Sequence, residues 1–224
     1  MILEVHTVFF RQWFGKTIYH IQVLIVSERI IDMIFESFFK TSLLSVLFHS
    51  GTDGGIFAGL LHPILGIDHL LAMVTVGLLS AQMGGKAIWT VPTTFVSVMA
   101  LGGVFGILGI PLPFVEYGIA LSVVVLGIAL LARKKISVPL AMVFVGLFAL
   151  FHGHAHGTEL PELSETALDV FAYVFGFLVA TASLHLIGAL IGQMAINTPR
   201  GASILRFSGA LIATAGVFLV MGLL

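Results

Sequence analysis

The sequence predicts an all-α integral membrane protein with about six transmembrane helices, N-out and C-out after a leader segment. Of its 224 residues, 58% are hydrophobic and only 9% are charged. The apolar residues form long uncharged runs separated by short polar breaks, a pattern typical of a polytopic membrane protein. A soluble domain of this length would need far more polar surface to cover its core.

A window of about 20 residues per span predicts helices at residues 67–83, 87–109, 114–132, 136–152, 167–195 and 204–224. The breaks between them carry interfacial residues: prolines at 111 and 113, basic residues at 133–135 and an acidic stretch at 158–166. These features separate the spans without requiring long loops.

The charges predict the orientation of these spans. Alternating spans place every basic residue after position 50 at one end of the bundle, which the positive-inside rule assigns to the cytoplasm: Lys86, Arg133, Lys134, Lys135, Arg200 and Arg206. The acidic residues fall at the opposite end: Asp53, Asp68, Glu116, Glu159, Glu162, Glu165 and Asp169. The membrane domain is therefore expected to be N-out and C-out.

Two regions are predicted: an N-terminal extension with a leader at residues 1–48, and a six-helix membrane domain at residues 49–224. Residues 33–48 carry Lys40 before an apolar core, as signal peptides do, and an N-out domain needs such a leader. Residues 1–32 mix charges with apolar positions and do not predict a span. A cytoplasmic amphipathic arm with an uncleaved anchor is the alternative, because no small-residue cleavage site precedes His49.

Residues 62–69 place two imidazoles and a carboxylate at the mouth of an apolar segment: His62, Asp68 and His69. One ionisable side chain in hydrocarbon costs about 2.5–3.5 kcal/mol, so this group indicates a protein-lined cavity or a bound cation. Pro63 and Gly66 are expected to break the helix, which would let the carboxylate join the histidines. The alternative is a simple helix start, capped by Asp68.

A second histidine run lies at residues 151–159 and contains His152, His154, His156 and Glu159. In an extended segment all three histidines would face one way, whereas on a helix His152 and His156 share a face. Either conformation offers at least two metal ligands. A histidine-rich loop that binds metal without transporting it is the alternative. Alternating spans put this run at the same end of the bundle as residues 62–69.

Other polar and small residues receive more limited predictions. His185, within the fifth predicted span, is a functional candidate by its depth, or else a neutral histidine hydrogen-bonded between helices. Glu116 and Asp169 are expected to be solvated or to cap helix dipoles. The methionines are expected to pack, and small faces for close helix packing are expected at Gly102, Gly103, Gly106, Gly109, Gly188 and Gly192.

Composition excludes several kinds of chemistry. The chain has no cysteine, so it cannot form a disulfide, a thiolate metal site or an iron–sulfur cluster. Any metal must be held by nitrogen and oxygen. The formal charge of -1 gives no sign of a nucleic-acid partner. The sequence contains neither HExxH nor GxSxG, so an enzyme is not predicted.

The two motifs, HPxxGxDHxLAM at residues 62–73 and FHGHAHGxE at residues 151–159, resemble those of the HupE/UreJ family in sequence and in order. The resemblance covers about residue 49 to the C-terminus and includes a histidine after the leader, here His49. Members are regarded as secondary permeases for nickel, and sometimes cobalt, that supply hydrogenase or urease maturation. The resemblance implies uptake of Ni²⁺ or Co²⁺ as substrate, without a cofactor, across a bacterial cytoplasmic (inner) membrane.

The predicted metal-binding residues are therefore His49, His62, Asp68, His69, His152, His154, His156, Glu159 and His185. The expected sequence of events is capture at the outer histidines, partial dehydration at residues 62–69 and passage inward past His185. A non-transporting metal sensor or chaperone, and a membrane metalloenzyme, are the alternatives. Imidazole and carboxylate ligands suit Ni²⁺, Co²⁺ and Zn²⁺ alike. The sequence leaves the oligomeric state open, including a homo-oligomer in the bilayer.

Overall fold

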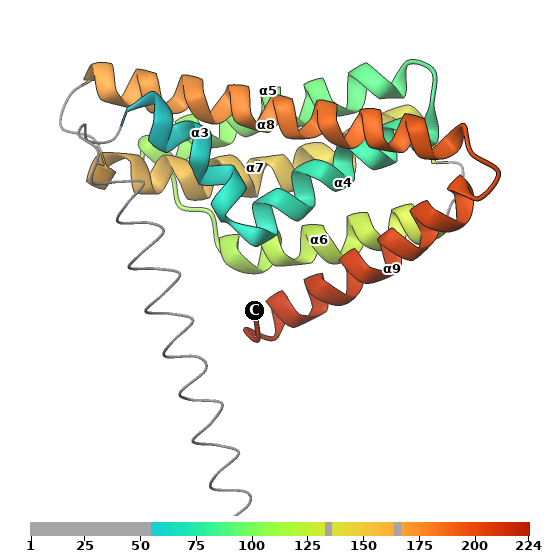
Figure 1. Ribbon diagram of the computed structural model, residues 1–224. Helices are drawn as coiled ribbons and strands as arrows, with labels where there is room; N and C mark the ends of the chain where they lie inside the picture. The colour runs from blue at the N-terminus through green and yellow to red at the C-terminus, as the bar shows by residue number, and fades with distance from the viewer. Residues whose placement is uncertain (1–54, 133–135, 164–166) are drawn as a thin grey trace, which may run out of the picture. The chain divides into compact units, whose positions relative to one another are not determined.

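The computed structural model describes residues 55–132, 136–163 and 167–224. These residues form α-helices joined by short connections, with no β-strand among them (Figure 1). The helices in chain order are α3 (Ile56–Leu65), α4 (Ile67–Met83), α5 (Ala87–Ile107), α6 (Val115–Ala132), α7 (Val138–Leu163), α8 (Ala167–Ile196) and α9 (Gly201–Val220). The predicted leader, its boundary with the membrane domain and His49 lie outside the described residues.

Five of the helices, α5 to α9, are each long and apolar enough to cross a membrane, and α3 with α4 form a sixth candidate span that bends by 83°. Large apolar side chains cover their outer faces; Trp89 is 69% exposed and Phe171 75%. Soluble monomers rarely expose so much apolar surface, whereas lipid would cover it. The predicted all-α membrane class is therefore confirmed, while the N-out, C-out orientation stays a prediction.

Five of the six predicted spans match helices closely, and the fourth does not. That span was predicted to end at residue 152, but α7 continues to Leu163. The histidine run and the first part of the predicted acidic break, residues 158–163, are therefore helical. The glycines of this segment pack against α5, and this tertiary contact offsets their poor helix propensity.

The predicted helix break in the first span is confirmed, and it falls at Gly66. Pro63 lies inside α3, whereas Gly66 takes an extended backbone with φ -78° and ψ 110° between α3 and α4. Its N–H donates to the carbonyl of His62 at 3.2 Å, and its carbonyl accepts from Leu70 at 2.8 Å. The bend leaves Asp68 and His69 in the first turn of α4.

Parallel helices pack through glycines on both partners. On α5 and α7, an added Cβ at Gly153 would overlap the Met99 carbonyl oxygen, and one at Gly106 would overlap the His154 carbonyl oxygen. The α4–α8 pair repeats this arrangement with Gly188 against the Val74 carbonyl. Such backbone-to-backbone contact is how small residues join helices in a membrane. The predicted packing role is confirmed at Gly106 and Gly188, whereas Gly153 was not predicted to pack.

Gly109 is the exception among the glycines predicted to pack. It follows the end of α5 with φ 66°, and no neighbouring atom lies within 4 Å of a Cβ built there. A left-handed residue after the last turn is a common way to end a helix. Gly109 therefore ends α5 rather than packing it against a neighbour.

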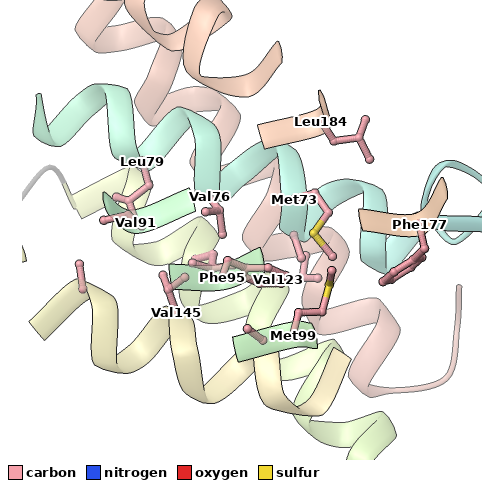
Figure 2. Packing of buried hydrophobic residues seen from close by; sticks show 14 of the residues in the cluster. Met73, Val76, Leu79, Val91, Phe95, Met99, Val123, Val145, Phe177 and Leu184 are labelled. Carbon is pink, nitrogen blue, oxygen red and sulfur yellow. The ribbon is translucent and has the colours of Figure 1, made fainter. Parts of the chain in front are cut away.

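The apolar core lies between α4, α5, α6, α7 and α8 (Figure 2). Met73 and Met99 are buried there beside Phe95 and Val123. The predicted packing role of methionine is confirmed at these two positions. The core also includes Tyr173 and Phe177, which border the polar cluster described next.

Candidate metal site

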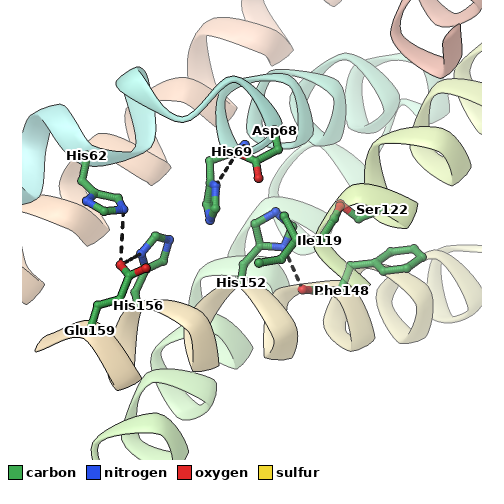
Figure 3. A network of polar contacts seen from close by, with 9 residues as sticks. All are labelled: His62, Asp68, His69, Ile119, Ser122, Phe148, His152, His156 and Glu159. Carbon is green, nitrogen blue, oxygen red and sulfur yellow. Dashed lines mark hydrogen bonds and ion pairs between the residues drawn. The ribbon is translucent and has the colours of Figure 1, made fainter. Parts of the chain in front are cut away.

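Four histidines from three helices converge at one place (Figure 3). His62 comes from α3, His69 from α4, and His152 and His156 from α7. The ring centroids lie 4.5 Å apart for His69 and His156, 4.6 Å for His62 and His156, and 4.8 Å for His69 and His152. The structure thus brings the two distant sequence motifs together in one cluster, which we call the histidine row.

Helical periodicity explains the alternation of histidine and small residues in α7. His152 and His156 are four residues apart and share the face that looks toward α3 and α4. Gly153 and Gly157, also four residues apart, lie on a neighbouring face in backbone contact with α5. The glycines therefore bring α5 close, while the histidines one residue earlier point into the cluster.

Most of the row is buried, and several of its ring nitrogens lack hydrogen-bond partners within the described residues. His152 is 0% exposed, and His69 and His156 are also buried. Within the described part of the chain, Nε2 of His69, Nε2 of His152 and both ring nitrogens of His156 have no hydrogen-bond partner. A buried polar atom without a partner costs roughly 1–3 kcal/mol. A metal ion bound to any of these nitrogens would relieve part of that cost.

Two of the imidazoles are held so that Nε2 faces the row. Asp68 Oδ1 lies 2.7 Å from His69 Nδ1, and the Phe148 carbonyl oxygen lies 2.9 Å from His152 Nδ1. Each oxygen accepts the Nδ1 proton, which leaves a lone pair on Nε2, as in the carboxylate–histidine–metal arrangement of metalloproteins. Asp68, predicted as a metal ligand, contacts the His69 ring through Oδ1, on the Nδ1 side of that ring.

Glu159 marks the open end of the row. Its Oε2 lies 3.8 Å from His62 Nε2 and 3.8 Å from His156 Nδ1, and ligand atoms of these three residues lie within 4.8 Å of one another. Glu159 is 55% and His62 33% exposed, in contrast to the buried His152. From Glu159 to His152 the row follows seven residues of α7, about 10 Å of helix.

His154 does not point into the row. Its Nε2 lies 2.7 Å from the carbonyl oxygen of Ile110, in the connection between α5 and α6. Nε2 is therefore the protonated nitrogen, and it ties α7 to that connection. On this geometry His154 holds the fold around the row, although the sequence placed it among the metal-binding residues.

We therefore expect His154→Ala to lower the thermal stability of the protein without weakening its affinity for Ni²⁺. The variant loses the hydrogen bond from His154 Nε2 to the Ile110 carbonyl, which contributes about 0.5–1.5 kcal/mol. Thermal unfolding in detergent and calorimetric titration with Ni²⁺ measure the two quantities separately. A drop in affinity as large as that caused by His156→Ala would place His154 among the ligands.

His185 lies apart from the row. It is buried in α8, its ring centroid is 5.0 Å from that of Phe95, and neither ring nitrogen has a hydrogen-bond partner within the described ranges. The alternative of an imidazole hydrogen-bonded between helices therefore has no support in these residues. Glu116 and Asp169 lie in the first turns of α6 and α8, positions that suit the predicted capping role.

Two aromatic residues of α8 border the row and were not predicted. The ring of Phe177 lies 4.2 Å from that of His156, and the ring of Tyr173 lies 5.9 Å from that of His62. The buried Tyr173 hydroxyl has no hydrogen-bond partner within the described residues. In the sequence both residues resemble ordinary aromatic side chains of an apolar span, so no signal distinguished them.

The fold and the site define a class: a polytopic α-helical membrane protein that carries a row of buried imidazoles, with a carboxylate at its open end. The HupE / UreJ protein family model matches residues 39–219. Protein HupE of Rhizobium leguminosarum bv. viciae is 48% identical over 168 residues, which cover 75% of this chain and 85% of that protein. No solved structure matches the chain. The chain belongs to the HupE/UreJ family.

Proposed function

We propose that the protein is a secondary transporter that takes up Ni²⁺, with Co²⁺ as a second substrate, across the bacterial cytoplasmic membrane. The observation that carries the proposal is the set of unpartnered imidazole nitrogens inside a membrane span. Neutral imidazole is a good ligand for nickel, cobalt, copper and zinc. Membership of the HupE/UreJ family supports nickel and cobalt, and with them a link to hydrogenase or urease maturation.

In the proposed mechanism the ion moves along the row by ligand exchange. Glu159, His62 and His156 capture it at the exposed end, where an aqueous ion can lose its first waters to nitrogen and carboxylate ligands. His156 also borders His69, with ring centroids 4.5 Å apart, so the ion can gain a new ligand before it leaves the old ones. His69 and His152 then hold it deeper in the bundle.

The charge pattern supports the direction of this movement. Lys86 and Arg200 lie in the α4–α5 and α8–α9 connections, which Figure 1 shows at one end of the bundle. His62 and Glu159 lie toward the other end, where α3 begins and α7 finishes. With the basic end in the cytoplasm, the row opens to the outside and the domain is N-out and C-out.

A non-transporting sensor or chaperone would bind Ni²⁺ at the same row but would not move it. Radioactive nickel flux into liposomes that contain the purified protein separates the two functions. We expect saturable, protein-dependent accumulation in the lumen. Binding of nickel to the protein with luminal nickel no higher than in protein-free liposomes would favour the sensor and refute the transporter.

We expect transport to weaken as the outside pH falls, because protons compete with the metal for the imidazole nitrogens. Protonation removes the lone pair, so the loss should grow toward acidic pH and recover as the pH rises. Initial rates of nickel uptake, measured at fixed membrane potential across about pH 5 to 8, test this. A flat profile would count against imidazole ligation.

A further inference from the structure

Backbone contacts join three of the helices around the row into one body, which we call the α8 body: α3, α4 and α8. An added Cβ at Gly59 of α3 would overlap the Tyr173 carbonyl oxygen of α8, and one at Gly77 of α4 would overlap the His185 carbonyl oxygen. These contacts lie on either side of the bend at Gly66. α8 therefore holds both halves of the bent span in place.

α5 and α7 form a second body, which we call the α5–α7 body. Four glycines join the two helices: Gly102 and Gly106 of α5, and Gly153 and Gly157 of α7. An added Cβ at any of them would overlap a carbonyl oxygen of the partner helix. Helices whose backbones touch over several turns have little freedom to shift, because the obstacles are peptide groups and not side chains. α6 and α9 are joined in the same way.

The boundary between the α8 body and the α5–α7 body has a different character. Within the described residues, no glycine of one body would place a Cβ against the backbone of the other. Buried apolar side chains lie between them, among them Met73 and Val76 of α4 and Met99 of α5 (Figure 2). Packed helices that meet through side chains can slide by small amounts.

Two cavities lie along this boundary. One, of about 360 Å³, is formed by residues 88–97 of α5 and 182–189 of α8, and it runs along the flank where Trp89 and Leu186 are exposed. The other, of about 70 Å³, lies between α5, α7 and α8 and is lined by His156 and Tyr173. Protein interiors are otherwise close-packed. The boundary therefore has room for movement that the glycine contacts within each body lack.

The histidine row crosses the boundary. The α8 body supplies His62 and His69, and the α5–α7 body supplies His152, His156 and Glu159. The hydrogen bonds that orient two of the rings each stay within one body, to Asp68 and to the Phe148 carbonyl. Ring nitrogens without partners within the described residues occur on both sides. An ion bound to nitrogens from both sides would bridge the two bodies.

We propose that the α8 body and the α5–α7 body move against each other during transport, and that an ion bound between His69 and His156 draws them together. This inference rests on the proposed transport function. Many transporters expose one site to each side of the membrane in turn by rocking one bundle against another. In one position the row opens at Glu159, and in the other it opens along the boundary toward the basic end.

The test links the two bodies covalently. The chain has no cysteine, so two introduced thiols can join chosen helices. Thr93→Cys on α5 and Leu186→Cys on α8 line the same cavity from different bodies. Joining them with a reducible bis-methanethiosulfonate reagent should abolish nickel flux into liposomes, because the bodies can no longer separate. Reduction of the link should restore the flux.

Two controls isolate the effect of the link. Val98→Cys with Gly146→Cys joins α5 to α7 within one body, where a Cβ at Gly146 lies 3.6 Å from Cγ2 of Val98. This link should leave nickel flux near that of the wild type. A single-headed methanethiosulfonate on Thr93→Cys and Leu186→Cys adds bulk to the cavity without a link, and it should also leave the flux intact.

The outcomes separate the two proposals. Undiminished flux through protein whose α5–α8 link is confirmed by mass spectrometry would overturn the movement and leave the transporter intact. Equal loss of flux from the α5–α7 link would overturn it as well. If the first pair does not transport before linking, Val96→Cys with Ala182→Cys, across the same cavity, decides in the same way. A wild-type protein that binds nickel but moves none would refute the transport function, and the movement with it.

Discussion

His69→Ala is expected to abolish nickel uptake while the protein remains folded and inserted. His69 is the imidazole that joins the two ends of the row, with ring centroids 4.5 Å from His156 and 4.8 Å from His152. Without it the ion at the outer ligands has no neighbouring nitrogen to receive it. We expect calorimetric titration to show loss of high-affinity Ni²⁺ binding, and cellular uptake to fall to the level of cells without the protein.

A graded series sharpens this prediction. Asp68→Asn removes the carboxylate that holds His69 Nδ1 at 2.7 Å but leaves the ligand itself. Loss of such an orienting partner typically weakens metal binding by about 10–100-fold, so this variant should bind better than His69→Ala. His154→Ala is the matched control from the same histidine run. Wild-type affinity in His69→Ala would remove the row from the transport mechanism.

Gly153→Ala is expected to destabilise the protein more than any other single methyl group added to α7. The new Cβ would overlap the carbonyl oxygen of Met99, so α5 and α7 would have to separate. Overpacking typically costs about 1–3 kcal/mol and sometimes more, and here the obstacle is backbone, which cannot rotate away. We expect a lower thermal midpoint in detergent and weaker Ni²⁺ binding, because His152 and His156 move with α7.

Gly146→Ala is the matched control on the same helix. A Cβ there meets only side-chain methyl carbons of Val98 and Thr94, at 3.6 and 3.7 Å. Since alanine favours the helix over glycine by about 1 kcal/mol, this variant should be as stable as wild type or more so. Equal midpoints for the two variants would show that the close α5–α7 contact does not hold the row in place.

The spans were largely predictable because hydropathy and length determine them. The prediction for α4 agrees with the structure at both ends, at Ile67 and Met83. Two segments were not predicted. A window of about 20 residues per span does not detect the 10 residues of α3, and Pro63 within them indicates a helix break. The histidine–glycine alternation in α7 is compatible with either an extended segment or a helix, since nothing in one segment reveals that α5 packs against its glycines.

The location of the candidate site followed from the sequence more readily than the roles of its residues. Alternating spans place the two motifs at the same end, and the structure brings their histidines into contact. The partner of His154 is a carbonyl 44 residues earlier in the chain, in a connection that the motif does not contain. Asp68 Oδ1 accepts from both the backbone N–H and the Nδ1 of its neighbour His69 in the first turn of α4. Such roles depend on side-chain directions, which spacing alone does not give.

The most direct test of the metal site is X-ray absorption at the nickel edge of the Ni²⁺-loaded protein. If the histidine row holds the ion, the spectrum should show nitrogen ligands at about 2.0–2.1 Å with the outer-shell scattering of several imidazole rings. The imidazole count should fall in His152→Ala and His69→Ala but not in His154→Ala. A shell of oxygen ligands without imidazole scattering, in a protein that binds nickel and remains folded, would contradict the account.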